Sequence, residues 1–202
     1  MNKATQKAFS EIYTNHGWGD NPVSGPGSAS QVTAPLITQL LPLFAAHNIK
    51  SVLDMGCGDD TWARRIDWSG LGIKYMGCDI VPQIIEDNKA KYANTGMNFC
   101  VRDATTSNLP RYDLILWRDV ATHLTNADAA EAVRLFVDSG ASYLLATTFP
   151  ETTVNKDIVT GGWRILNMRM EPFMLDKPTA LLPEFSPDGL FLDKCMGLWP
   201  LQ

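Results

Sequence analysis

The chain has 202 residues, of which 45% are hydrophobic and 19% charged, and its net charge is −5. This length and balance fit one globular domain with its own hydrophobic core. The acidic charge, without any Lys/Arg cluster, argues against tight non-specific binding to a nucleic-acid backbone, although a local basic groove for a particular RNA or DNA stays open.

No apolar stretch is long enough to cross a membrane, because Pro42 and His47 interrupt the best candidate, around residues 36–46. The polar N-terminus lacks the apolar core of a signal peptide. The four cysteines are far apart and form no C-x-x-C pair, which argues against a zinc site or a redox motif. We therefore expect a cytoplasmic protein that binds no metal and no membrane.

The predicted elements begin with a short N-terminal helix, which a Gly/Pro/Ser-rich stretch at residues 17–31 separates from a longer one. Apolar residues recur at three-to-four spacing from Val32 to Leu41 and predict this longer helix, with Pro35 in its opening turns. Strand-like and helix-like segments alternate after it. Strands are expected at residues 51–55, 74–80, 97–103, 112–118 and 141–149, and helices at residues 60–67, 82–93 and 126–138.

Two of these helices have recognisable start signals. Pro82 is a favourable first helical residue, and Thr125 followed by Asp128 resembles a capping box. After Phe149 the helical periodicity disappears, and residues 164–170 and 189–199 are expected to form late strands. Alternating strands and helices predict an α/β fold in a single domain, a doubly wound, mostly parallel sheet with helices on both faces.

The side chains that suggest chemistry all follow the ends of predicted strands. They are Gly56 and Gly58 after the first strand, Asp79 at the second, Asp103 at the third, and Arg118 with Asp119 at the fourth. In an open parallel sheet, ligands bind beyond the carboxyl ends of the strands. The sequence therefore predicts one binding site at this edge of the sheet.

The glycine turn after the first strand distinguishes between two kinds of cofactor. A dinucleotide site needs G-x-G-x-x-G, with the pyrophosphate on a helix N-terminus. Here Gly56-x-Gly58 is followed by Asp59 and Asp60, so the third glycine is missing and two carboxylates are expected where the pyrophosphate would rest. S-adenosylmethionine carries no phosphate and avoids this conflict, which disfavours an NAD-dependent oxidoreductase.

The segment LDMGCGD, residues 53–59, resembles motif I of the class I S-adenosylmethionine-dependent methyltransferases. The resemblance covers residues 50–149 with four motifs in order, and it implies a seven-stranded, Rossmann-like sheet. It also implies that Asp54 contacts the methionine amino group, that Asp79 binds the ribose hydroxyls, and that Asp103 accepts from the adenine amino group. The implied cofactor-binding residues of the core are Asp54, Gly56, Cys57, Gly58, Asp79, Ile80, Asp103, Ala104 and Arg118. Any one of the three aspartates could be only a turn or cap residue at a strand end. Their occurrence together, in the order of the family's motifs, favours a binding role for all three.

The stretch SGPGS, residues 24–28, lies where methyltransferases often place a lid over the cofactor. We therefore expect residues 1–30 to form an N-terminal helix and lid, and residues 31–202 to form the core. Serine hydroxyls and glycine N–H groups there could hold the methionine carboxylate, and Trp18 could close over it. The expected lid residues are Trp18, Ser24, Gly25 and Ser28. A flexible linker is the equal alternative.

The segment LWRDVATHLT, residues 116–125, occupies the family's motif IV position, nearest the transferred methyl group. It has neither the N-P-P-Y pattern linked to adenine or glutamine nitrogen nor a Pro-Cys nucleophile for cytosine. Asp119 and His123 are four residues apart, which places them on one face if this segment is helical. We expect His123 to be the catalytic base and Asp119 to orient it or an acceptor hydroxyl. The alternative is that both are structural.

A long irregular segment follows, with a candidate substrate loop near residues 149–164. Asn155, Trp163 and Arg164 offer an aromatic surface and fixed donors, which suit a polyhydroxylated or anionic acceptor. The expected function is methyl transfer to an O or N atom of a small-molecule or glycan-like acceptor. A non-catalytic S-adenosylmethionine-binding sensor or partner subunit, and an enzyme that consumes this cofactor otherwise, remain alternatives. The sequence does not indicate an oligomeric state.

Overall fold

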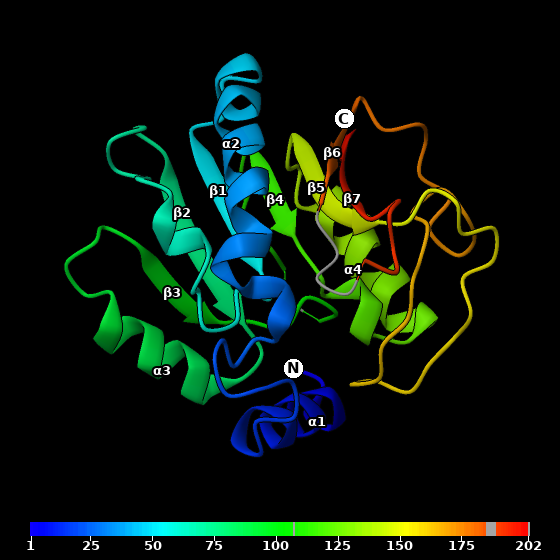
Figure 1. Ribbon diagram of the computed structural model, residues 1–202, viewed down its shortest axis with the longest axis horizontal. Helices are drawn as coiled ribbons and strands as arrows, with labels where there is room; N and C mark the ends of the chain where they lie inside the picture. Colours follow the sequence, from blue (N-terminus) through cyan, green and yellow to red (C-terminus); the bar gives the residue numbers. More distant parts are fainter. Residues whose placement is uncertain (107, 185–188, 202) are drawn as a thin grey trace.

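A computed structural model describes residues 1–106, 108–184 and 189–201. A seven-stranded sheet forms its centre, with the strand order β3-β2-β1-β4-β5-β7-β6 (Figure 1). The strands are β1 Ser51–Met55, β2 Lys74–Asp79, β3 Asn98–Val101, β4 Leu114–Trp117, β5 Tyr143–Thr148, β6 Ala180–Pro183 and β7 Cys195–Pro200. Strands β1 to β5 pair in parallel, whereas β7 is antiparallel to both β5 and β6. The predicted doubly wound, mostly parallel sheet is confirmed.

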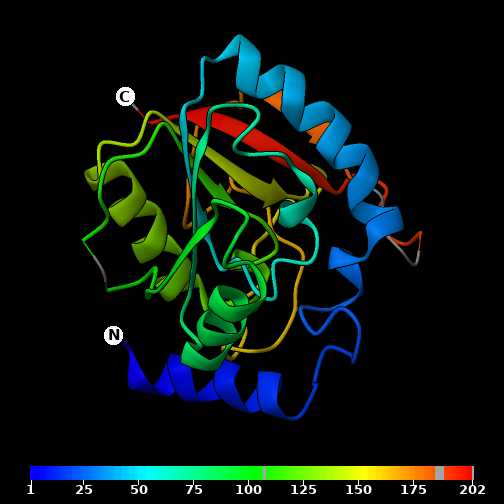
Figure 2. The ribbon, with the colours of Figure 1, turned by 90° about the vertical axis from the view of Figure 1, so that its left-hand side faces the viewer.

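Helices cover both faces of this sheet, as predicted, and Figure 2 shows α2 and α4 on opposite sides of it. The helices are α1 Lys3–Thr14, α2 Ser30–Ala46, α3 Pro82–Lys91 and α4 Asn126–Asp138, with single turns of 3-10 helix η1 Pro26–Ser28, η2 Ala63–Arg65 and η3 Ala121–His123. The Thr125 hydroxyl caps α4 by accepting from Asp128 N at 3.1 Å. In the part of the chain that the structure describes, no helix has the length and apolar character to cross a membrane.

Neighbouring residues of each strand point into two different hydrophobic clusters. Val52 of β1 and Leu116 of β4 face the first cluster, which packs against α2, whereas Leu53 and Ile115 face the second, which packs against α4. This alternation follows from the two-residue period of a strand. Because both faces are buried at the centre of the sheet, β4, with the sequence LILW, is apolar throughout.

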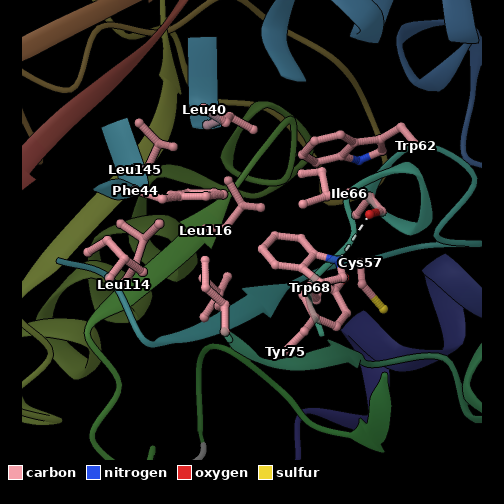
Figure 3. Close-up of a cluster of buried hydrophobic side chains, with 14 of the residues drawn as sticks. Leu40, Phe44, Cys57, Trp62, Ile66, Trp68, Tyr75, Leu114, Leu116 and Leu145 are labelled. Carbon is pink, nitrogen blue, oxygen red and sulfur yellow. Dashed lines mark hydrogen bonds between the residues drawn. The ribbon is translucent and has the colours of Figure 1, made fainter. Parts of the chain in front are cut away.

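The helix predicted at residues 60–67 is wrong, because this segment has only the 3-10 turn η2. Trp68, in the first cluster, explains the difference (Figure 3). Its indole N–H donates to the Ala63 carbonyl at 3.0 Å, and its ring stacks on Tyr75 at 4.7 Å. The buried indole thus takes the carbonyl that a continuing helix would offer to Asp67.

The late strands are also placed differently from the prediction. Residues 164–170 form no strand, because Asn167 in their centre turns its amide to the carbonyls of Pro150 and Thr152, at 3.0 and 2.9 Å. The strand expected at residues 189–199 begins only at Cys195, and β6 was not predicted. The two edge strands of the sheet, β3 and β6, have four residues each.

The N-terminal segment lies at the carboxyl ends of the strands, where α1 is found at the bottom of Figure 1, below the sheet. Asn2 N donates to the Asp103 carboxylate at 2.6 Å, and Gln6 Nε2 donates to the Ile80 carbonyl at 3.0 Å. These bonds join α1 to the segments that follow β3 and β2.

Candidate functional site

A cavity of about 510 Å³ lies at the carboxyl ends of the strands. Its walls come from three parts of the chain: α1 with the loop behind it, the ends of β1, β2 and β4 with the segments that follow these strands and β3, and four residues that follow β5. These four are Phe149, Trp163, Phe191 and Lys194. The structure thus brings together the strand-end residues Gly56, Gly58, Asp79, Asp103, Arg118 and Asp119.

The glycine turn after β1 has no room for side chains. Gly56 and Gly58 have φ angles of +85° and +57°, which glycine adopts without strain. A Cβ on Gly56 would lie 2.3 Å from Val120 Cγ2, and one on Gly58 would lie 2.1 Å from Ser24 Oγ. The two glycines therefore let this backbone, which includes Cys57, line the cavity between β4 and the N-terminal loop.

The two carboxylates after the glycines turn away from the cavity, so the expectation that they occupy a pyrophosphate position is wrong. Asp59 accepts from Val23 N at 3.1 Å and from the Ser24 hydroxyl at 3.0 Å, which ties the N-terminal loop to the glycine turn. Asp60 is fully buried with φ of +55° and accepts from the Tyr75 hydroxyl at 3.0 Å. The absence of the third glycine of the G-x-G-x-x-G pattern still disfavours a dinucleotide site.

Asp54, expected to contact the methionine amino group, lies beneath the turn and not in the cavity wall. It is 2% exposed and accepts from the same Tyr75 hydroxyl, at 2.8 Å. Burial raises the pKa of Asp54 to about 7 and raises the pKa of Asp60 well above its usual range. One phenol proton cannot serve two carboxylates, so this buried pair needs a second proton and supports the turn from below.

Asp79 at the end of β2 lines the cavity and keeps free acceptor capacity. Its Oδ2 accepts from Gly58 N at 3.1 Å and its Oδ1 accepts from Val81 N at 3.0 Å. Burial raises the pKa of Asp79, against the lowering effect of three backbone donors, Val81, Gly58 and Ile80. A carboxylate has about four acceptor sites, so one remains for a ligand hydroxyl.

Asp103 also lines the cavity, but four donors already occupy its carboxylate. Oδ1 accepts from the backbone N and the hydroxyl of Thr105, both at 2.8 Å, and Oδ2 accepts from Asn2 N at 2.6 Å and the Thr106 hydroxyl at 2.9 Å. Burial would raise the pKa of Asp103, but these donors together lower it below its usual range. A further donor, such as the expected adenine amino group, has to displace one of the four.

The N-terminal loop is an ordered wall of the cavity rather than a free linker. Trp18, Ser24, Gly25 and Ser28 all line the cavity. The Trp18 ring lies 4.6 Å from that of His123, and the Gly27 carbonyl accepts from Arg118 Nη2 at 2.8 Å. The loop therefore contacts both the end of β4 and η3.

Four charged side chains form a network at the floor of the cavity. Arg118 Nε donates to Glu184 Oε1 at 2.7 Å, and Lys194 Nζ donates to Asp119 Oδ2 at 2.8 Å. Burial alone would raise the pKa of Asp119, but Lys194 and Arg118 overcome it and hold this pKa below its usual range. No hydrogen bond joins Asp119 to His123 among the described residues, so the structure does not show Asp119 orienting the imidazole. The alternative, that Asp119 orients an acceptor hydroxyl, stays a prediction.

His123 lies in η3, which is a single 3-10 turn, so the predicted sharing of a helix face with Asp119 is wrong. Its Nδ1 lies 2.7 Å from the Gly162 carbonyl. A carbonyl can only accept, so Nδ1 carries the hydrogen and Nε2 keeps a lone pair. Burial lowers the pKa of His123, which favours the neutral ring at neutral pH. This side chain lines the cavity as a proton acceptor with a fixed tautomer.

Two of the three expected substrate residues, Asn155 and Arg164, donate hydrogen bonds to backbone carbonyls and do not line the cavity. Asn155 Nδ2 donates to the carbonyls of Asn167 and Glu171, at 2.9 and 2.8 Å. Arg164 is 6% exposed and donates to the Leu124 carbonyl at 3.0 Å, to the Lys156 carbonyl at 2.6 Å, and to the Asn126 side chain. Neither lines the cavity, whereas Trp163 does.

Sequence reasoning missed Phe149, Phe191, Lys194 and Glu184 at this end of the site. Phe149 and Phe191 look like core residues, and nothing in their spacing marks them. The pair Asp193-Lys194 directly before an apolar strand was the available signal, because lysine is rarely buried without a charged partner.

Comparison with known proteins agrees with this fold. A family described as a methyltransferase domain matches residues 52–139. No curated protein matches the sequence. Magnesium protoporphyrin IX methyltransferase (ChlM) from Synechocystis PCC 6803, with bound SAH, is similar in structure, with a TM-score of 0.65, 11% identity, and 98% of each chain covered.

Two further solved structures are similar. PigF with SAH has a TM-score of 0.62 and 17% identity, over 83% of this chain and 55% of that chain. The methyltransferase domain of bacterial-CtHen1-CN has a TM-score of 0.62 and 12% identity, over 84% of this chain and 99% of that chain. The domain match, on a seven-stranded sheet of this topology, is consistent with a class I S-adenosylmethionine-dependent methyltransferase and assigns residues 52–139 to a methyltransferase domain.

Proposed function

We propose that the chain transfers the methyl group of S-adenosylmethionine to an O or N atom of a small-molecule acceptor, glycan-like compounds included, with His123 as the general base. The observation that carries this proposal is the hydrogen bond from His123 Nδ1 to the Gly162 carbonyl, at 2.7 Å, because it leaves Nε2 free to accept a proton. A base is needed when the acceptor is a hydroxyl or a protonated amine.

The cofactor would lie along the strand ends. Its ribose would bind the remaining acceptor site of Asp79, and its adenine would lie beside Ile80, Ala104 and Asp103, which all line the cavity. The two glycines support this placement, because their positive φ angles form the tight turn whose backbone lines the cavity. The volume of about 510 Å³ is in the range of small-molecule sites.

The methionine end would lie under the N-terminal loop, which thereby acts as a lid. The Ser28 hydroxyl would meet its carboxylate, with Ser24, Gly25, Cys57 and Arg118 lining the same part of the cavity. The Ser24 hydroxyl and the N–H groups of Gly25 and Ser28 already donate to Asp59, Pro22 and Gly25, so each would have to exchange its partner to bind the carboxylate. Trp18 would then shield the reacting atoms from water, since its ring already covers His123.

The cofactor supplies a methyl group on a sulfonium, which is transferred by in-line displacement. The protein aligns the acceptor with this methyl group, excludes water, and takes the acceptor proton at His123 Nε2. Nucleic acid is not the proposed acceptor, because the net charge is −5 and the sequence has no Lys/Arg cluster to neutralise a phosphate backbone. Cytoplasmic location stays an expectation.

Calorimetric titration with S-adenosylmethionine, S-adenosylhomocysteine and NAD tests the cofactor placement, using the wild type and Asp79→Asn. We expect micromolar binding of the two adenosyl ligands, weakened by about ten- to a hundredfold in Asp79→Asn, because hydrogen bonds to a charged group contribute roughly 1.5–3 kcal/mol. Asp138→Asn, in an exposed ion pair on α4, is the matched control and should bind like the wild type. Unchanged affinity in Asp79→Asn would contradict the placement.

A further inference from the structure

We propose that the acceptor is a planar aromatic molecule with a ring hydroxyl, held against Phe149, Trp163 and Phe191 with its oxygen between His123 and Lys194. This inference rests on the proposed function and specifies the substrate class of the same site.

Three aromatic side chains form one wall of the cavity, here called the aromatic wall. The Phe191 ring lies 5.0 Å from that of Trp163 and 5.8 Å from that of Phe149. Phe149 is 1% exposed and anchors the wall, whereas Trp163 is 51% exposed. Because Trp163 is half-exposed at the cavity wall, part of its indole ring is not packed against the protein and is available to a ligand. The flat ring of an aromatic ligand can stack against such an indole ring.

The polar side chains that a sugar would require are already engaged elsewhere. Asn155, Arg164 and Asn167 donate to backbone carbonyls of their own loop and its surroundings. Polyhydroxylated ligands need several free donors and acceptors, because each buried hydroxyl without a partner costs free energy. The aromatic wall therefore favours an apolar ring over a glycan.

Two polar groups remain for the acceptor at this end, His123 and Lys194, which both line the cavity. Lys194 Nζ donates one hydrogen bond, to Asp119 Oδ2 at 2.8 Å, and lies 3.7 Å from Glu184 Oε2 in an ion pair that is too long for a hydrogen bond. An ammonium group has three donors, so a remaining one can meet an oxygen that develops negative charge. One base and one cation suit a single ionisable hydroxyl.

The acidity of the hydroxyl decides between aromatic and aliphatic acceptors. His123 is a weak base, because burial lowers its pKa. A phenol has a pKa of about 10, whereas an aliphatic hydroxyl is a far weaker acid. The phenol proton moves to His123 Nε2, the oxygen bonds to the methyl carbon, and the methyl–sulfur bond breaks with its electron pair going to sulfur. The products are an aryl methyl ether and S-adenosylhomocysteine, and the imidazolium then releases its proton to water.

Calorimetry in the presence of S-adenosylhomocysteine tests this inference with three probes. They are 2-naphthol, its saturated analogue decahydro-2-naphthol, and methyl glucoside. We expect 2-naphthol to bind at least tenfold more tightly than the other two. Trp163→Leu should weaken 2-naphthol binding about tenfold and leave the affinity for S-adenosylhomocysteine unchanged, because stacking contributes roughly 0.5–1.5 kcal/mol beyond burial. Leu181→Ala, at an exposed leucine of β6 outside the cavity wall, is the control.

Equal affinity for the three probes, no binding of any, or a preference for methyl glucoside would overturn the inference, whatever the cofactor affinity. The proposed function fails separately, if S-adenosylmethionine does not bind or if Asp79→Asn binds it like the wild type. Formation of 2-methoxynaphthalene from S-adenosylmethionine, followed by mass spectrometry, would support both.

Discussion

The two ends of the cavity are built by different means. At the end formed by β1 and β2, the wall includes backbone and aspartates at or just after strand ends, within one stretch of about 50 residues from Gly56 to Asp103. At the opposite end, side chains from Asp119, His123, Phe149, Trp163, Phe191 and Lys194 meet only through tertiary structure. The positions of the residues at the first end thus follow from their order along the chain. The positions of the residues at the second end depend on the tertiary contacts that hold the loops in place. Mutations should therefore act locally at the first end and through the loop framework at the second.

The largest expected effect is on the base of the second end. His123→Asn should lower kcat by about 10²- to 10⁴-fold, the usual contribution of general base catalysis, with an unchanged Kd for S-adenosylmethionine. In the wild type, kcat/KM should fall as the pH drops through the lowered pKa of His123, so this acid limb lies below pH 6.5. His47→Asn, next to Tyr143 and outside the cavity wall, is the control. A variant with wild-type kcat would exclude His123 as the base.

A smaller effect is expected from the loop framework. Arg164→Met leaves the carbonyls of Leu124 and Lys156 without their donor, so the free energy of unfolding should fall by about 2–4 kcal/mol. Because Arg164 clamps the turn that carries His123, kcat should also fall, and the acid limb of the pH profile should move. Denaturant unfolding and pH–rate profiles measure the two effects.

Arg134→Met, in an exposed ion pair network on α4, should change stability by less than about 1 kcal/mol. If Arg164→Met instead raises the KM for the acceptor, with wild-type stability and an unchanged pH profile, then Arg164 is a substrate-binding residue.

The smallest expected effect concerns the carboxyl pair beneath the first end. The folded pKa of Asp54 is raised to about 7, so the native state binds more protons than the unfolded state between about pH 4 and 7. The stability that this proton provides is present at low pH and lost as the pH rises through 7. The free energy of unfolding should fall by roughly 1–3 kcal/mol from pH 5.5 to 8.5.

Asp60→Asn should flatten this pH dependence, because it removes one of the two buried charges and asparagine tolerates the positive φ of this position. Thermal unfolding at several pH values measures the slope. Asp67→Asn, at a carboxylate that caps an exposed turn, should keep the wild-type slope. A slope that Asp60→Asn leaves unchanged would contradict the shared proton.

The sequence was informative where a local signal decides the structure. The bounds of β1 and α4 agree with the prediction, because a glycine turn ends the strand and Thr125 caps the helix. The helix expected at residues 60–67 and the strand expected at residues 164–170 failed where one distant side chain, that of Trp68 or Asn167, takes backbone hydrogen-bonding groups. Local periodicity carries no information about such bonds.

In the candidate site, too, the sequence predicts features that depend on local order and misses those that depend on distant contacts. The convergence of the strand ends is predictable from the topology, whereas the direction of each side chain depends on which face of the strand carries it. Asp54 shares a strand face with Val52, two residues away, and this period points it at the first hydrophobic cluster and Tyr75. Lys194 and Glu184 could not be paired from sequence, because ion pairing between a loop and a strand end depends on the register of β6 and β7.

The edge strands β3 and β6 have a consequence for self-association. Each has only four residues, and β6 ends at Pro183, which has no N–H to donate. An unpaired edge is a template on which a second chain can add a strand, and long flat edges lead to aggregation. Short edges offer few pairing groups, so this seven-stranded sheet is poorly suited to grow edge to edge and should resist aggregation by strand addition.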